Sequence, residues 1–216
     1  GLPVFAHVSR QADLEDAINA GVDVLVHTVG DQVLTHVDSL LKKMREDSIY
    51  FTPTLSIAYM HQYLETAEIL DDPFMLQYSS ERTNRSLRNW PIRQLMVKSA
   101  GIDTDNLKKF MLQNFAIFYE AGVPILMGSD AGNPSVIPGY SSHKELEFMA
   151  LEGMSNADVL RSATIVPARF LGLADTMGSI DEGKVASFIL LDRNPLEDVR
   201  NSRSINRVML EGYWIE

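Results

Sequence analysis

The chain has 216 residues, of which 45% are hydrophobic and 22% are charged, so it can bury a core and is not disordered. Its formal net charge of -10 argues against nucleic acid as a partner, because phosphate binding requires a basic face. No apolar run approaches the roughly 18 residues that a membrane helix needs, so we expect no membrane partner.

Cysteine is absent, which excludes disulfides and thiolate metal sites and favours a reducing compartment, the cytoplasm. The opening stretch Gly1–His7 carries neither a basic segment nor a long apolar core and therefore predicts no signal peptide. It is typical of the entry to an inner strand, so we expect part of the fold to lie upstream.

The first quarter of the chain alternates short apolar runs with amphipathic segments. Strands are predicted at Pro3–Val8, Val22–Val29 and Ile49–Leu55, and helices at Gln11–Ala20 and Thr35–Arg45. The runs lack alternation, as buried parallel strands do. Pro53 cannot donate to a neighbouring strand, which indicates that the third strand leaves the sheet there.

Two histidines occupy matching positions in the first two strands. His7 ends the first strand, and His27 lies near the end of the second. The strand–helix–strand unit makes these strands parallel, so both imidazoles should emerge at the same end of the sheet. Taken singly, each histidine is more often a satisfied core or turn residue than a metal ligand, and that alternative stays open.

The segment Ser56–Ala121 is too long for an ordinary connection between strands. It predicts two or three helices with breaks near Asp72-Pro73 and near Gly101, the last helix running over Asn106–Ala121. Part of this segment is expected to cover the strand ends as a lid. His36 and His61 lie within or just before helical patterns and are interpreted as surface or packing residues.

A further strand is predicted at Val123–Met127, followed by a glycine turn that carries Asp130. In a barrel of alternating strands and helices, chemistry occurs at the carboxyl ends of the strands, which makes this acid a catalytic candidate. The alternative is that Asp130 only closes a turn or caps the next segment of the chain.

The loop Asn133–Ser142 after that acid is rich in Gly, Pro and Ser. We expect the segment Asn133–His143 to form part of a pocket wall, with Tyr140 and His143 as substrate-binding groups. The alternative role for His143 is helix capping. Helices are predicted at His143–Leu151 and Ser155–Ala163, with a further turn or two at Val166–Leu171.

Short strands with tight turns begin at Met177 and predict a small all-β segment, with a strand at Val185–Leu191 and a hairpin at Ile205–Ile215. We therefore divide the chain at residues 1–176 and 177–216. The first part carries the α/β pattern, and the second part is the all-β segment.

His7, His27 and Asp130 thus gather at one end of the predicted sheet. Neutral imidazole and carboxylate are ordinary ligands of a divalent ion such as zinc. Such an ion lowers the pKa of a bound water to about 7. A nearby carboxylate can take the proton and pass it to a leaving group.

These residues resemble a known family. The segments Phe5-Ala6-His7, Val26-His27-Thr28 and Gly128-Ser129-Asp130-Ala131-Gly132 are similar to fifth-, sixth- and eighth-strand motifs of the amidohydrolase superfamily, in its imidazolonepropionase-like and metal-dependent dipeptidase-like branch. The similarity continues through His143-Lys144-Glu145-Leu146-Glu147, Ala163-Thr164-Ile165-Val166-Pro167-Ala168-Arg169, Gly178-Ser179-Ile180-Asp181-Glu182-Gly183-Lys184-Val185-Ala186 and Asn194-Pro195-Leu196. It covers nearly the whole chain.

The resemblance implies an α/β fold, a partial (β/α)8 TIM barrel of strands five to eight with a C-terminal β-sandwich segment. His7 and His27 would bind one metal, with zinc expected and one or two ions in total. Asp130 would contact the second metal or the shared water and act as general base. The implied reaction is hydrolysis of an amide-like C–N bond in a small substrate, such as a dipeptide, an N-acyl amino acid or a cyclic amide.

The family usually completes this site with a His-x-His on the first strand and often a carboxylated lysine on the fourth. This sequence contains no His-x-His. We therefore expect an incomplete enzyme whose partners are a small-molecule substrate and either the missing N-terminal half or a homo-oligomer. Two alternatives stay open: a non-catalytic fragment or degenerate scaffold that needs a partner chain, and a phosphate-binding barrel, which lacks a Lys or Arg beside the glycine loop.

Overall fold

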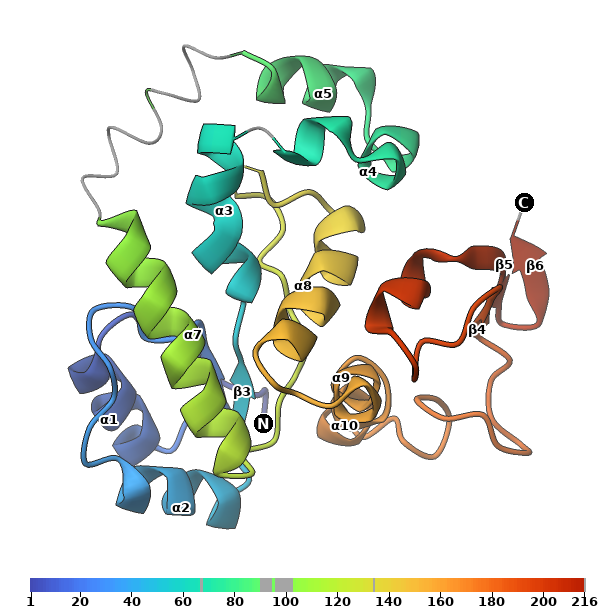
Figure 1. Ribbon diagram of the computed structural model, residues 1–216. Coiled ribbons are helices and arrows are strands. Elements are labelled where there is room, and N and C mark those ends of the chain that lie inside the picture. The colour runs from blue at the N-terminus through green and yellow to red at the C-terminus, as the bar shows by residue number, and fades with distance from the viewer. Residues whose placement is uncertain (67, 90–94, 96–102, 134, 216) are drawn as a thin grey trace.

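Two three-stranded sheets and a set of surrounding helices make up the fold in the computed structural model (Figure 1). The structure describes residues 1–66, 68–89, 95, 103–133 and 135–215. The strands are β1 (Phe5–His7), β2 (Val24–Val26), β3 (Tyr50–Thr52), β4 (Phe188–Leu191), β5 (Ile205–Leu210) and β6 (Tyr213–Ile215). The helices are α1 (Gln11–Ala20), α2 (Asp38–Glu46), α3 (Leu55–Thr66), α4 (Pro73–Tyr78), α5 (Glu81–Leu87), α7 (Thr104–Glu120), α8 (Tyr140–Leu151), α9 (Asn156–Ser162) and α10 (Ile165–Phe170), with 3-10 turns η1 (Glu68–Asp71) and η2 (Val199–Arg203).

The first sheet is parallel, in the order β1-β2-β3. A fourth segment continues it beside β3, where Phe51 donates its N–H to the Pro124 carbonyl at 2.9 Å and accepts from Leu126 N–H at 2.8 Å. The predicted strand Val123–Met127 is therefore wrong as a regular strand, because it forms a single parallel bridge between Phe51 and Ile125. Pro124 has no N–H to donate, which shortens the pairing that this segment can make.

The predicted α/β class with parallel strands is confirmed, but within the described ranges the barrel does not close. β1 pairs with β2 on one side, and its Phe5 side chain is 54% exposed. Phe170 of α10 covers part of the same sheet face, with its ring 5.8 Å from that of Phe5 and 4.8 Å from that of Tyr50. This face, which carries Phe5 and Tyr50 and would be the inner face of a closed barrel, is consequently only partly covered.

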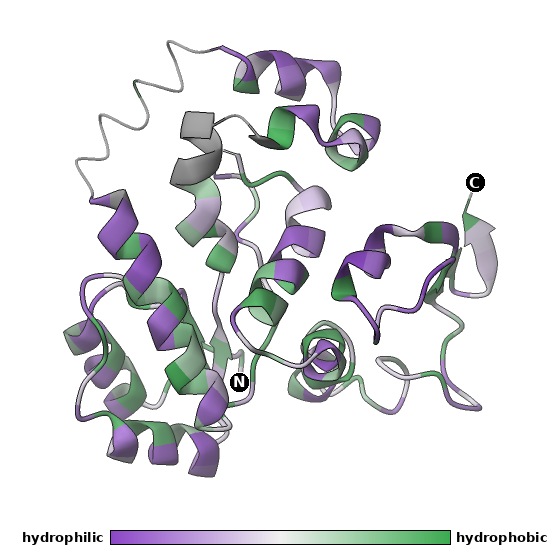
Figure 2. Ribbon diagram, viewed as in Figure 1, coloured by the Kyte–Doolittle hydropathy of each residue, from purple (hydrophilic) through white to green (hydrophobic). Residues whose placement is uncertain are grey.

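The opposite face of the sheet packs against helices and forms the main core. Phe51 of β3 stacks on Phe118 of α7 with ring centroids 4.1 Å apart. Leu14 of α1 and Met44 of α2 are buried in the same cluster. In Figure 2 these helices alternate hydrophilic and hydrophobic stretches, as expected of amphipathic helices with one face on a core.

Several predicted boundaries are confirmed. The helix α1 has the predicted bounds and ends at Gly21, whose φ of 75° is left-handed. The strand β3 ends immediately before Pro53, and Ser155 caps α9 by accepting a hydrogen bond from Asp158 N–H. The helix α2 begins at Asp38 and not at Thr35.

The long segment after β3 contains more helices than the two or three predicted. The helices α3, α4, α5 and α7 and the turn η1 all lie in it. Asp72 caps α4 with Pro73 as its first residue, which confirms the predicted break there, and Ser80 caps a separate α5. The predicted break near Gly101 lies outside the described residues, and the role of this segment as a lid stays a prediction.

The second sheet is antiparallel, in the order β4-β5-β6, as the all-β prediction required. Its hairpin turns at Glu211 and Gly212, which both have positive φ and so match the twist of the flanking strands. The connection between β4 and β5 contains η2. The division of the chain at residue 176 stays a prediction. Over the ranges that the structure describes, every helix is too short or too polar to cross a membrane.

The start of α3 is held by a buried carboxylate from α8. Glu145 is fully buried and accepts hydrogen bonds from Leu55 N–H at 2.6 Å, Ser56 N–H at 2.7 Å and Ser56 Oγ at 2.7 Å. Burial raises the pKa of this carboxyl to about 7 in spite of those hydrogen bonds. In its protonated form the carboxyl can donate to Ser56 Oγ. Glu145 therefore fixes the backbone at the point where the chain leaves β3.

The raised pKa of Glu145 predicts a loss of stability as the pH rises from about 4.5 to about 7. Within this window the native state binds the proton and the unfolded state has released it, so the free energy of unfolding falls with pH. The expected loss is about 3 kcal/mol, on the order of 1.4 kcal/mol per pKa unit. Glu145→Gln, which mimics the protonated acid, should lack this contribution.

Urea unfolding of both proteins at several pH values measures the effect. The difference in the free energy of unfolding between parent and Glu145→Gln should favour the parent more at acid pH than at neutral pH. A difference that does not change with pH would contradict the raised pKa. Glu120→Gln, at an exposed position on α7, serves as the control.

Candidate metal centre

The structure brings His7, His27 and Asp130 together at the carboxyl ends of the parallel strands. The rings of His7 and His27 meet edge to face with their centroids 4.6 Å apart. Asp130 Oδ2 lies 4.0 Å from His27 Nδ1. His7 is the last residue of β1, and His27 comes directly after β2. Parallel pairing of these strands places the two imidazoles side by side.

The backbone at this edge adopts uncommon conformations. His27, Thr54 and Asp130 have φ of 76°, 51° and 55°, in the left-handed region that side chains with a Cβ seldom occupy. Each of the three directly follows, or lies within a few residues of, a segment of the parallel sheet. Strained residues of this kind concentrate at functional sites, where surrounding contacts hold them.

His27 is suited to act as a neutral ligand. Burial lowers the pKa of its imidazole, the neighbouring His7 lowers it further, and Asp130 opposes both effects. At neutral pH the side chain therefore keeps a lone pair on one ring nitrogen. Its Nδ1 lies 2.8 Å from Thr54 Oγ1. Thr54 was not predicted from the sequence, although a polar residue after the end of a strand is the same signal that identified the histidines.

Two imidazoles and a carboxylate suit a divalent cation in kind. Within the part of the chain that the structure describes, however, no group of three or more His, Cys, Asp or Glu side chains is arranged to hold a metal ion. The three side chains thus fit a divalent cation in chemistry and lie at the same edge of the sheet, but within the described residues they are not arranged to hold one. The roles of His7, His27 and Asp130 as ligands stay a prediction.

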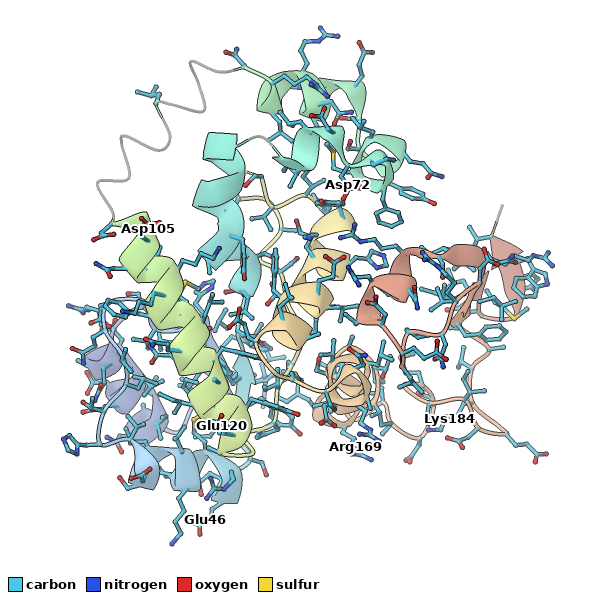
Figure 3. All side chains as sticks on the ribbon, viewed as in Figure 1. Glu46, Asp72, Asp105, Glu120, Arg169 and Lys184 are labelled. Atoms are coloured by element: carbon cyan, nitrogen blue, oxygen red, sulfur yellow. The ribbon has the colours of Figure 1, made fainter. Side chains whose placement is uncertain are left out.

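Tyr140 and His143 belong to a second cluster, around the amino-terminal end of α8. Tyr140 is 4% exposed and donates its hydroxyl to Asp72 Oδ2 at 2.9 Å, and Figure 3 labels Asp72 between α4 and α8. His143 Nδ1 lies 2.9 Å from Ser202 Oγ, and its ring meets Phe74 edge-on at 5.1 Å. Burial lowers the pKa of His143, and Arg203 lowers it further. Their role in substrate binding stays a prediction.

Charged residues far apart in the chain complete this second cluster. Arg203 of η2 pairs with Asp72 at 3.0 Å and also with Glu147 of α8. Lys144 Nζ lies 2.6 Å from the other oxygen of Glu147. The cluster therefore joins α4, α8 and η2. No local motif signals it, because Arg203 and Asp72 are 131 residues apart.

His36 belongs to neither cluster. His36 is exposed in a turn with φ of 56°, as the sequence predicted for a surface residue. The side chain of His61 lies outside the described residues.

Known proteins with similar sequences include imidazolonepropionases. An imidazolonepropionase of Shouchella clausii is 31% identical over 100 residues, which are 44% of this chain and 21% of that protein. An imidazolonepropionase of Erwinia tasmaniensis is 36% identical over 74 residues, which are 34% of this chain and 18% of that protein. The chain is thus similar to these enzymes over a limited part of their length.

Solved structures match over the whole chain. A Xaa-Pro dipeptidase with bound methionine in the active site has a TM-score of 0.71 at 25% identity, and the match covers 100% of this chain and 45% of that one. Phenylurea hydrolase B has a TM-score of 0.66 at 25% identity, covering 100% and 44%. The chain therefore spans less than half the length of these solved relatives.

The predicted family resemblance is confirmed by a comparison with family models. The model of the amidohydrolase family matches residues 1–215, which take in nearly the whole chain. The chain belongs to the amidohydrolase family.

Proposed function

We propose that His7, His27 and Asp130 are this chain's share of a metal site in a hydrolase that cleaves an amide-like C–N bond. The observation that carries the proposal is their convergence from separate strands. The imidazole rings lie 4.6 Å apart, and the carboxylate lies 4.0 Å from one of them. Nearby charged and imidazole groups at strand ends are the usual composition of a metal-dependent hydrolytic site.

A bound divalent cation such as zinc, one or two ions in total, would supply Lewis acidity toward a substrate carbonyl. His7 and His27 would hold it as neutral imidazoles, consistent with the lowered pKa of His27. Asp130 would accept a proton from the attacking water on a carboxylate oxygen and deliver it to the departing nitrogen. The exposed position of Asp130 leaves its carboxylate accessible to both.

Membership of the amidohydrolase family, together with the similarity to imidazolonepropionases and to a Xaa-Pro dipeptidase, supports a small substrate with a C–N bond. A dipeptide, an N-acyl amino acid or a cyclic amide would each meet this description. Tyr140 and His143 would contribute to the substrate pocket from the start of α8. In the present arrangement their polar atoms are engaged with Asp72 and Ser202, so contact with substrate requires these hydrogen bonds to be exchanged.

A second candidate function is a non-catalytic fragment or degenerate scaffold that needs a partner chain. The open inner face favours it, because Phe5 and His7 at the edge of the sheet are both exposed. The incomplete set of metal donors in the described residues favours it as well. The partner would supply further strands beside β1 and the remaining ligands, as the missing N-terminal half or as a second copy.

The proposed metal site predicts that zinc binding depends on the two clustered histidines. The double variant His7→Gln, His27→Gln should weaken zinc binding by at least about tenfold, because both imidazole donors are lost. His36→Gln, at an exposed histidine, should bind as the parent does. Calorimetric titration with zinc, followed by elemental analysis after dialysis, measures the difference. Equal zinc uptake by the parent and the double variant would contradict the proposed metal site.

The proposed general base predicts a large kinetic effect. Asp130→Asn in the complete enzyme should lower kcat by at least about 10²-fold, the lower end of the usual range for a general acid–base group. Asp175→Asn, an exposed acid after α10, should retain parental activity. Steady-state assay of dipeptide and cyclic amide hydrolysis provides the measurement. Activity of Asp130→Asn within a few-fold of the parent would exclude this residue from the mechanism.

The second candidate function predicts complementation. An amino-terminal half from a homologous amidohydrolase, mixed with this chain, should produce turnover that neither component shows alone. Turnover is assayed for each component separately and for the mixture, and the metal content of each component is measured as well. Stoichiometric metal and turnover by this chain alone would refute the requirement for a partner.

A further inference from the structure

We propose that Thr54 is a positioning residue for His27. Its hydroxyl accepts the Nδ1–H of His27, so that the other ring nitrogen, Nε2, keeps its lone pair for a cation. The use of Nε2 as a ligand rests on the proposed function. The hydrogen bond and the tautomer that it selects can be tested without any metal.

The contact is short and shielded. His27 Nδ1 and Thr54 Oγ1 are 2.8 Å apart, and Thr54 is 1% exposed, so its hydroxyl is shielded from water. Asp130 Oδ2 lies 4.0 Å from the same nitrogen. Two oxygens therefore face Nδ1. The carboxylate oxygen of Asp130 can only accept and so favours a proton there, and the Thr54 hydroxyl can accept the resulting N–H. A neutral imidazole carries one proton, which leaves Nε2 without one.

Further hydrogen bonds connect the segments in which these two side chains lie. His27 N–H donates to the Thr52 carbonyl at 2.9 Å, and Thr28 N–H donates to the Pro53 carbonyl at 3.2 Å. Thr28 Oγ1 donates to the same Pro53 carbonyl at 2.9 Å. Together with the bond to Thr54, these contacts tie the exit of β2 to the exit of β3. The imidazole is consequently held relative to both strands.

The backbone of Thr54 is strained, and hydrogen bonds of the residues that follow it in the chain hold it in place. Its φ of 51° is unusual for a β-branched residue. The next two residues, Leu55 and Ser56, donate their N–H groups to the buried carboxylate of Glu145. The strain therefore persists because surrounding contacts enforce it, as is common where a side chain must point in one functional direction. In this case the direction is toward His27, whose own φ is 76°.

The test compares two substitutions of Thr54 with a matched control. Thr54→Val removes the hydroxyl and keeps the β-branched shape, whereas Thr54→Ser keeps the hydroxyl. Thr28→Val removes a buried hydroxyl from the same pair of strand exits without touching the imidazole ring. Nitrogen-15 NMR of the metal-free chain at about pH 8, where histidine is neutral, reports which ring nitrogen carries the proton. His27→Gln assigns the resonance by its loss.

We expect the parent, Thr54→Ser and Thr28→Val to carry the His27 proton on Nδ1, and Thr54→Val to shift it toward Nε2. A parent His27 with its proton on Nε2 would overturn the proposal, even if Thr54→Val did not fold. An unchanged tautomer in folded Thr54→Val would overturn it as well.

Zinc titration separates this proposal from the proposed function. If His27 is a ligand, Thr54→Val should weaken zinc binding by about 10- to 100-fold, as loss of an outer hydrogen bond to a ligating histidine does. Thr54→Ser should restore it. If the parent binds no zinc, the proposed metal site fails for this chain without a partner, and the tautomer measurement still decides the role of Thr54.

Discussion

Parallel pairing of β1, β2 and β3 is the constraint on which the candidate site depends. The register pairs His7 with Val26, so the next residue, His27, stands beside His7. A shift by one residue would turn the inward side chains of a strand to the opposite face. The site is thus a consequence of strand alignment first and of particular side chains second. Core packing behind the sheet, such as the stack of Phe51 on Phe118, therefore also maintains the site.

The strand exits supply a second level of order. Glu145 binds the backbone at the start of α3, and the residue just before that point, Thr54, reaches His27. A buried acid in α8 is in this way connected through the backbone to an imidazole at the sheet edge. Glu145 accepts its hydrogen bonds from Leu55 and Ser56, so its contribution is to restrict the conformation of the segment that carries Thr54. Buried polar groups with complete hydrogen bonding are well suited to such a task.

The cluster around Arg203 has a different role in the architecture. Through Asp72 and Glu147 it connects α4 and α8 to η2, which lies in the connection between β4 and β5. The antiparallel sheet is therefore attached to the helical layer by charges as well as by apolar contacts. Because these side chains have low exposure, removal of one partner would leave the other charge buried and unpaired, which is costly. Tyr140 and His143 belong to the same cluster, so the predicted pocket wall is in contact with the carboxyl-terminal segment.

The sequence by itself determined the α/β class, the order of most elements and the gathering of His7, His27 and Asp130, because these depend on local periodicity and on the rule that parallel strands end together. It overestimated the strand at Val123–Met127 and underestimated the helices after β3, where Pro124 and the cap at Ser80 act locally against the broader pattern. Only the tertiary structure decided the contacts of Thr54, Glu145 and Arg203. Their partners lie 27 to 131 residues away, and such pairs form only when packing brings distant segments within hydrogen-bond distance.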